Sequence, residues 1–179
     1  IVTTLFIYIF GSSSWQIILA LWIIVPIIDI ILFSIVPMCK PIPAHELMNL
    51  TDLLKHPVFI VTLIAIMVGG ASEVTMSQWA SAFLERGLNL PKIFGDLLGV
   101  AVFSTTFGIG RSLYGKYGKK IDLHKVLIFG SISAAICYLV VGLCLNPIFP
   151  VVFAGLCGIS VALLWPGTLV IASEKFPKA

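Results

Sequence analysis

The stretch from Val58 to Leu84, VFIVTLIAIMVGGASEVTMSQWASAFL, decides the fold of this chain. Its first half is almost entirely apolar, and the whole stretch exceeds the roughly 20 residues that a helix needs to cross a bilayer. Glu73 lies in its middle. A carboxylate at that depth costs about 2.5 kcal/mol or more, so we expect Glu73 to face a water-filled path or another helix.

The composition of the whole chain agrees with a membrane protein. Of its 179 residues, 59% are hydrophobic and 11% are charged, whereas about 25% of a soluble domain is charged. We therefore predict an all-α, polytopic transmembrane helical bundle. No basic run with interleaved aromatic residues indicates nucleic acid. The four cysteines have neither C-x-x-C nor histidine spacing, so we expect no metal and no cofactor.

Hydropathy and turn residues divide the chain into spans. They predict a truncated helix followed by about five full spans, at residues 1–10, 15–37, 56–84, 93–114, 125–145 and 148–173. A polar connector occupies residues 38–55. Because the first apolar run begins at Ile1 and is too short to span, we expect the chain to be a fragment cut within a helix.

The basic residues predict the orientation of these spans. If the helices alternate, nine of the eleven Lys and Arg residues share one side, and only Arg86 and Lys92 lie on the other. The positive-inside rule then predicts that residues 38–56, 111–125 and 174–179 are cytoplasmic, in a multi-pass protein of the cytoplasmic membrane.

The polar residues around Glu73 are the first candidate site. Ser72, Thr75, Gln78 and Trp79 are close to it on the predicted helix, and hydroxyl, amide and indole groups suit a small polar solute. A partly desolvated carboxyl group can also exchange a proton near neutral pH. The alternative is that Glu73 is hydrogen-bonded to a neighbouring helix as a structural contact.

Asp29, Trp79 and Trp165 also lie within predicted spans, and each has a functional and a structural interpretation. Asp29 lies near the middle of the first span without polar neighbours, so it is a second proton-coupling candidate or a structural acid. Trp79 could stack on a sugar ring or pack against apolar groups. Trp165 lies equally deep, and we expect it to pack. Pro166, which follows it, predicts a kink.

The loop GRSLYGKYGKKID, residues 110–122, resembles the loop motif of the major facilitator superfamily, which reads Gly, a short apolar stretch, Asp-Arg-x-Gly-Arg-Arg. Lys116, Gly118, Lys119 and Lys120 match its basic and glycine positions, and Gly115 stands in place of the Asp. The resemblance implies that these residues and Arg111 form a cytoplasmic gate loop. A generic basic loop is the alternative.

Within the superfamily, residues 70–79, 95–99 and 165–167 look like bacterial sugar permeases of the fucose and hexose proton symporter type. The resemblance implies that residues 1–37 end an N-terminal helical bundle, that 38–55 is the central connector and that 56–179 is an incomplete C-terminal bundle. It also implies a monomer that transports a small polar solute, a sugar or sugar-like metabolite, with H⁺ as the coupling ion.

Other functions stay open at this point. A multidrug or organic-solute exporter of the same fold is one, and a non-transporting membrane sensor or assembly protein is another. An enzyme is not expected, because the sequence lacks His-Glu-x-x-His and Gly-x-Ser-x-Gly and its three histidines fall at loops or span ends.

Overall fold

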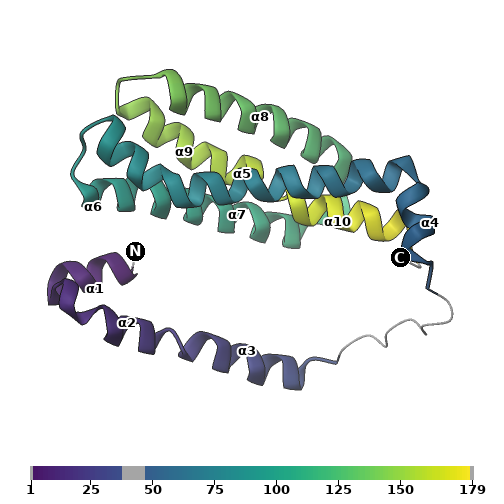
Figure 1. Cartoon of the computed structure of the whole chain (residues 1–179), viewed down its shortest axis with the longest axis horizontal. Coiled ribbons are helices and arrows are strands. Elements are labelled where there is room, and N and C mark those ends of the chain that lie inside the picture. Colours follow the sequence, from purple (N-terminus) through teal and green to yellow (C-terminus); the bar gives the residue numbers. More distant parts are fainter. Residues whose placement is uncertain (1, 38–46, 178–179) are drawn as a thin grey trace. The chain divides into compact units, whose positions relative to one another are not determined.

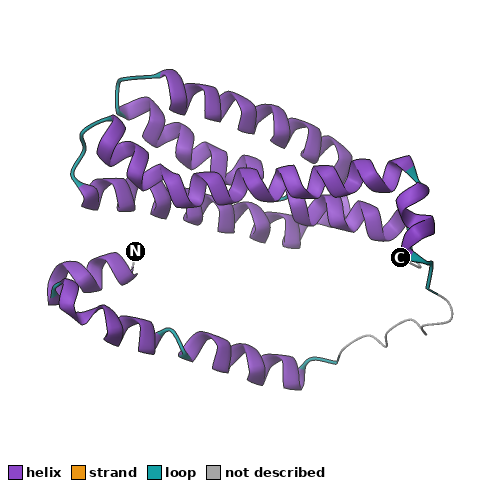
Figure 2. Cartoon of the chain, in the orientation of Figure 1, coloured by secondary structure: helices purple, strands orange, loops and turns teal. Residues whose placement is uncertain are grey.

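The computed structural model describes residues 2–37 and 47–177, and these residues form helices, turns and loops without a β-strand (Figure 2). The predicted all-α fold is confirmed. The chain divides into two compact units, residues 1–47 and 48–179, because contacts concentrate within each of them. Their assignment to the N-terminal and C-terminal bundles of a transporter stays a prediction, as does the connector, of which residues 38–46 lie outside the described part.

The first unit is a short helical hairpin. It contains α1 (Val2–Phe10), the 3₁₀ turn η1 (Ser12–Ser14), α2 (Trp15–Leu21) and α3 (Ile24–Ile35). Gly11 turns the chain with φ +83°, a conformation that glycine adopts without strain. The indole Nε1 of Trp22 donates to Thr3 Oγ1 at 3.1 Å and joins the two arms of the hairpin.

The predicted first span is therefore interrupted. Pro26 has no N–H to donate to the carbonyl of Trp22 four residues earlier. The N–H of Val25 donates to that carbonyl instead, at 3.2 Å, and the helix breaks between α2 and α3. Residues Trp15–Ile35 remain long and apolar enough to cross a membrane as one span.

The second unit consists of four membrane-length stretches that run back and forth (Figure 1). Its elements are α4 (Leu50–Lys55), α5 (Pro57–Gly87), α6 (Lys92–Phe94), the π-helix η3 (Gly95–Ala101), α7 (Val102–Tyr117), the 3₁₀ turn η4 (Gly118–Lys120), α8 (Leu123–Leu143), α9 (Ile148–Val161) and α10 (Leu164–Lys175). The described residues thus hold five helical stretches long enough to span a membrane, in agreement with the prediction.

Helix α9 packs between α7 and α8 and forms the core of this unit. Small residues allow the close approach: a Cβ at Gly158 would collide with the carbonyl oxygen of Phe103 and the hydroxyl of Thr106. The Thr106 hydroxyl also donates to the carbonyl of Gly155 at 2.6 Å, which ties α7 to α9. Such close contacts are typical of helices that associate in membranes without a hydrophobic driving force.

Helix α5 packs against η3 at one end and α10 at the other. Near the first end, the Ser81 hydroxyl donates to the carboxylate of Asp96. Near the second, a Cβ at Gly69 would lie 3.0 Å from the backbone nitrogen of Trp165. Gly69 therefore brings the middle of α5 against the start of α10, which positions the polar cluster described next.

Candidate functional site

The break between α9 and α10 is the first component of the site. Leu163 departs from helical geometry with φ −112° and ψ −2°. In a continuous helix the carbonyl of Ala162 would accept from the N–H of residue 166, but Pro166 has none. The kink predicted at Trp165-Pro166-Gly167 is therefore present, and the Ala162 oxygen is free to accept another donor.

Arg111 supplies that donor. Its Nε donates to the Ala162 oxygen at 3.1 Å, and its guanidinium carbon lies 4.1 Å from the centre of the Phe107 ring. The preceding residue makes the approach possible, because a Cβ at Gly110 would lie 2.8 Å from the Cβ of Ala162. A guanidinium stacked on an aromatic ring and bonded to a carbonyl is held in one orientation.

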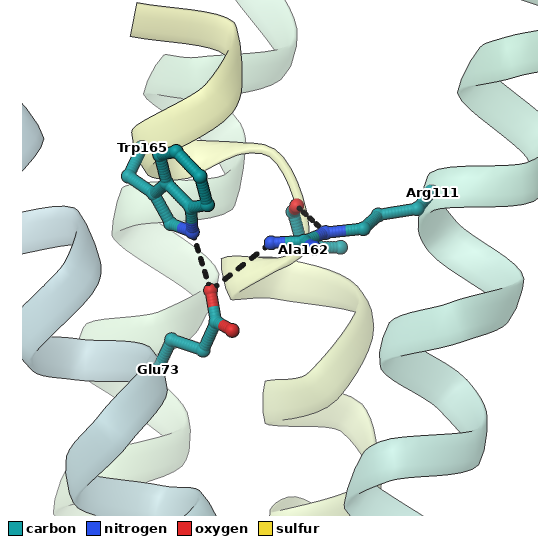
Figure 3. A network of polar contacts seen from close by, with 4 residues as sticks. All are labelled: Glu73, Arg111, Ala162 and Trp165. Atoms are coloured by element: carbon teal, nitrogen blue, oxygen red, sulfur yellow. Dashed lines mark hydrogen bonds and ion pairs between the residues drawn. The ribbon is translucent and has the colours of Figure 1, made fainter. Parts of the chain in front are cut away.

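Glu73 completes the cluster from the middle of α5. Its Oε2 accepts from the Trp165 indole Nε1 at 2.7 Å and from Arg111 Nη2 at 3.2 Å (Figure 3). Among the described residues its second oxygen, Oε1, accepts no hydrogen bond. Three helices thus meet at one carboxylate, and α5, α7 and α10 each contribute one side chain.

The ion pair at this site is only partly shielded. The side chain of Glu73 is 23% exposed and that of Arg111 is 38% exposed within the described chain. Both residues belong to membrane-length helices, where an ionisable residue pairs with another or faces a water-filled cavity. The pair is therefore not enclosed in a dry core.

The placement of Arg111 corrects one prediction. The sequence grouped it with a cytoplasmic gate loop at 111–125, but residues 111–117 are helical and belong to α7. The reason is that the motif is preceded by an apolar helix that continues through it to Tyr117. Arg111 is consequently directed to Glu73 and Ala162 rather than to a loop.

The rest of the predicted gate loop lies at the end of α7. Lys116 is the last-turn basic residue of that helix, and Gly118, Lys119 and Lys120 form η4. Lys116 Nζ lies 5.3 Å from the ring centre of Tyr117. The gating role of these residues and their location in the cytoplasm stay predictions.

Asp122 then begins α8. Its Oδ1 accepts from the backbone N–H groups of His124 at 3.1 Å and Lys125 at 3.4 Å. The backbone N–H of Lys125 holds the pKa of Asp122 below the ordinary value of 3.8. Burial opposes this effect, and the Lys125 ammonium group and the backbone N–H of His124 add to the lowering. This is an N-cap, and it fixes where the basic turn ends and α8 begins.

The structure separates the other predicted solute ligands from Glu73. Thr75, Gln78 and Trp79 lie on exposed faces of α5, and the side chain of Trp79 is 67% exposed. Ser72 is half-buried, and its hydroxyl donates to the carbonyl of Val68 at 2.8 Å. At 100° per residue, Trp79 lies about 120° around the helix from Glu73. The predicted set therefore occupies more than one face.

Asp29 belongs to the first unit, where it is exposed on α3. Its side chain forms no ion pair or hydrogen bond with the described residues of that unit. Its proton-coupling role stays a prediction. In the described part of the chain, no group of three or more His, Cys, Asp or Glu residues could hold a metal ion.

Trp165 is the residue that sequence reasoning assigned to packing and that the structure assigns to the site. Its indole N–H reaches Glu73, and its ring centre lies 5.6 Å from the guanidinium carbon of Arg111. The Trp-Pro-Gly signal was recognised as a kink. That the Trp165 indole turns toward an acid could not be predicted from this motif, because the acid lies on a partner helix.

Comparison with known proteins identifies the family. A sequence model of the Major Facilitator Superfamily matches residues 1–179. The chain belongs to this superfamily. Its members are membrane transporters, and a helical, multi-pass chain with an acid–arginine pair inside its spans is consistent with a superfamily protein that moves small solutes. Neither a curated protein nor a solved structure gave a significant match.

Proposed function

We propose that this superfamily protein carries out secondary active transport of a small polar solute, a sugar or sugar-like metabolite, across the cytoplasmic membrane, and that proton movement drives it. The observation that carries the proposal is the pairing of Glu73 with Arg111 and Trp165 inside membrane-length helices. Ionisable residues within membrane spans are rare and mark substrate and ion pathways.

The geometry supports a proton role for Glu73. One of its oxygens is held by two donors, while the other is without a partner among the described residues, and the side chain is 23% exposed. A carboxyl group so placed can receive a proton on one oxygen while the other keeps its neighbours in position. Protonation then changes the charge of the cluster and weakens its attraction to Arg111.

The break between α9 and α10 supports a moving element beside the proton site. Alternating access is largely a rocking of helix bundles around a fixed site, which is commonly built from discontinuous helices. Here Trp165 belongs to α10, directly after the break. The Ala162 carbonyl, which has no helical partner because Pro166 lacks an N–H, accepts from Arg111 Nε. A change in the protonation of Glu73 therefore affects the break between α9 and α10 through two side chains, Trp165 and Arg111.

The proposal is tested with the full-length natural protein in proteoliposomes. Solute-driven proton uptake is followed with an internal pH dye over a panel of hexoses, deoxyhexoses and sugar acids. We expect at least one solute to acidify the interior, and Glu73→Gln to abolish the acidification while leaving solute binding measurable, because the amide keeps the hydrogen bonds but cannot carry the proton.

Glu85→Gln is the matched control, since Glu85 lies on the same helix near its end and outside the cluster. It should acidify like the wild type. If Glu73→Gln also acidifies like the wild type, Glu73 is a structural contact and the proton role belongs elsewhere, with Asp29 the next candidate. If no solute in the panel moves protons, the sugar and proton parts of the proposal are both wrong.

A further inference from the structure

We propose that the solute recognised at this site is an anion, a sugar acid or similar monocarboxylate, and that its carboxylate binds Arg111 when Glu73 is protonated. The inference rests on the proposed function, which makes Glu73 the proton site. It goes further by stating the charge of the solute and the residue that recognises it.

The first step is the charge of the cluster. Glu73 and Arg111 are 3.2 Å apart and neutralise each other while Glu73 is ionised. When Glu73 takes up a proton from water, the cluster keeps the positive charge of Arg111, which does not titrate in proteins. An uncompensated arginine within a membrane span is costly. An anion that arrives with the proton restores neutrality.

No other described group near the cluster can take over this compensation. The helices packed against α5 bring several titratable side chains. Tyr138 of α8 donates its hydroxyl to the carbonyl of Ser72 and is neutral. Asp96 of η3 is bonded to Ser81, eight residues and about 12 Å along α5 from Glu73.

The remaining groups are buried thiols or lie at the ends of the helices. Cys157 of α9 is fully buried. The others are at or near the ends of α4, α5, α6, α7, α8 and α10: Asp52, Lys55, His56, Glu85, Arg86, Lys92, Tyr114, Lys116, Tyr117, His124, Glu174 and Lys175.

The second step is the supply of donors. Arg111 Nε is occupied by the Ala162 oxygen, whereas Nη2 is used only by Glu73, and Nη1 has no partner within the described chain. Release of Glu73 leaves both terminal nitrogens for one carboxylate, the two-point geometry that guanidinium groups favour. The protonated oxygen of Glu73 is then a donor too, so the free polar groups of the cluster suit an acceptor.

The third step is access. A cavity of about 780 Å³ between α5, α8 and α10 has apolar walls and does not include Glu73 or Arg111. The two charged side chains are instead partly exposed beside Phe107 and Trp165. The aromatic rings offer flat surfaces for a sugar ring next to the guanidinium. An open, donor-rich site with aromatic walls fits a sugar acid better than an apolar drug.

Binding of matched solutes to the full-length natural protein tests the inference. The probes are D-glucuronate with D-glucose and D-galacturonate with D-galactose, pairs that differ only in the carboxylate, and affinity is measured by calorimetry between pH 5.5 and 8.5. We expect an acid to bind at least tenfold more tightly than its neutral partner. Its affinity should rise about tenfold for each pH unit of decrease above the titration of Glu73, because one proton is bound with each anion.

Two variants assign the effect to the cluster. Glu73→Gln leaves the positive charge of Arg111 without a carboxylate at every pH. Its affinity for the acid should therefore no longer vary with pH. The double variant Glu73→Gln with Arg111→Gln removes both charges and so leaves no unpaired charge within the spans. It should bind the acid at least tenfold more weakly than Glu73→Gln alone. Arg86→Gln, which lies at the end of α5, is the control and should change nothing.

The outcomes separate this inference from the proposed function. If neutral sugars drive proton uptake and the double variant binds solutes as Glu73→Gln does, transport is proton-coupled but the solute is not recognised as an anion by Arg111. If no acid of the panel binds better than its neutral partner, the inference is overturned. If neither acids nor neutral sugars move protons, the proposed function itself fails.

Discussion

Trp165→Phe tests whether the cluster is held together by the hydrogen bond that the structure shows. The substitution removes the indole N–H, which lies 2.7 Å from Glu73 Oε2, and keeps an aromatic ring beside Arg111. A hydrogen bond to a charged group contributes about 1.5–3 kcal/mol. Because Glu73 retains Arg111 and is 23% exposed to water, we take the lower end, about 1.5 kcal/mol.

That loss should be visible in thermal unfolding. For a chain of this size, 1 kcal/mol corresponds to about 2–4 °C, so the apparent Tm of the purified protein in detergent should fall by about 3–6 °C. Trp79→Phe is the matched control. It deletes the same atoms from a side chain that is 67% exposed on α5, and its Tm should stay within about 2 °C of the wild type, since exposed substitutions rarely exceed 0.5 kcal/mol.

A double-mutant cycle separates the hydrogen bond from the lost ring volume. In a Glu73→Gln background the acceptor is a neutral amide, whose hydrogen bond is about half as strong. Trp165→Phe should therefore cost about half as much in that background. If the decrease in Tm is the same in both backgrounds, or if Trp79→Phe lowers Tm as far as Trp165→Phe does, the reasoning about this contact is wrong.

Two further predictions concern packing and pH. Gly158→Ala should lower the apparent Tm by about 2–12 °C, because a Cβ there meets the Phe103 carbonyl and overpacking costs about 1–3 kcal/mol. Gly142→Ala is the control and should not lower it, because a Cβ there has nothing within 4 Å. Equal effects of the two substitutions would contradict the α7–α9 packing. Asp122→Ala should lower Tm at pH 7. Because the pKa of Asp122 is lowered on folding, its contribution is complete above 3.8 and is lost as the pH falls through the lowered value. The difference from the wild type should shrink as the pH of the melts is lowered from 3.8, and a difference that grows on acidification would contradict the cap.

The five membrane-length stretches could be predicted from the sequence because they depend on local composition. A helix that crosses a bilayer needs about 20 apolar residues and forms its backbone hydrogen bonds within itself, so each span can be recognised from its own residues. The five spans, the turn at Gly11 and the kink before Pro166 follow from hydropathy, glycine and proline. The main misplacement was Arg111, because a basic residue near a loop motif is ambiguous until the end of its helix is known.

The candidate site could be predicted only in part for the same reason. Glu73 was identified because a carboxylate in an apolar span is conspicuous by itself. Its companions were chosen by proximity in sequence, and Thr75, Gln78 and Trp79 fall on other faces of the helix. The residues that bond Glu73 are 38 and 92 positions away, and no periodicity within one helix indicates such partners.

The sequence by itself therefore determined that this protein is an all-α membrane protein with five membrane-length stretches and a kink at Pro166, and that Glu73 must find a partner. Those properties arise from each segment's own interaction with the bilayer. Only the tertiary structure decided that the partner is Arg111 with Trp165. Close approach at Gly69 and Gly110 brings three helices together where Pro166 leaves a carbonyl free. Which surfaces meet depends on the packing of whole helices, which no single segment specifies.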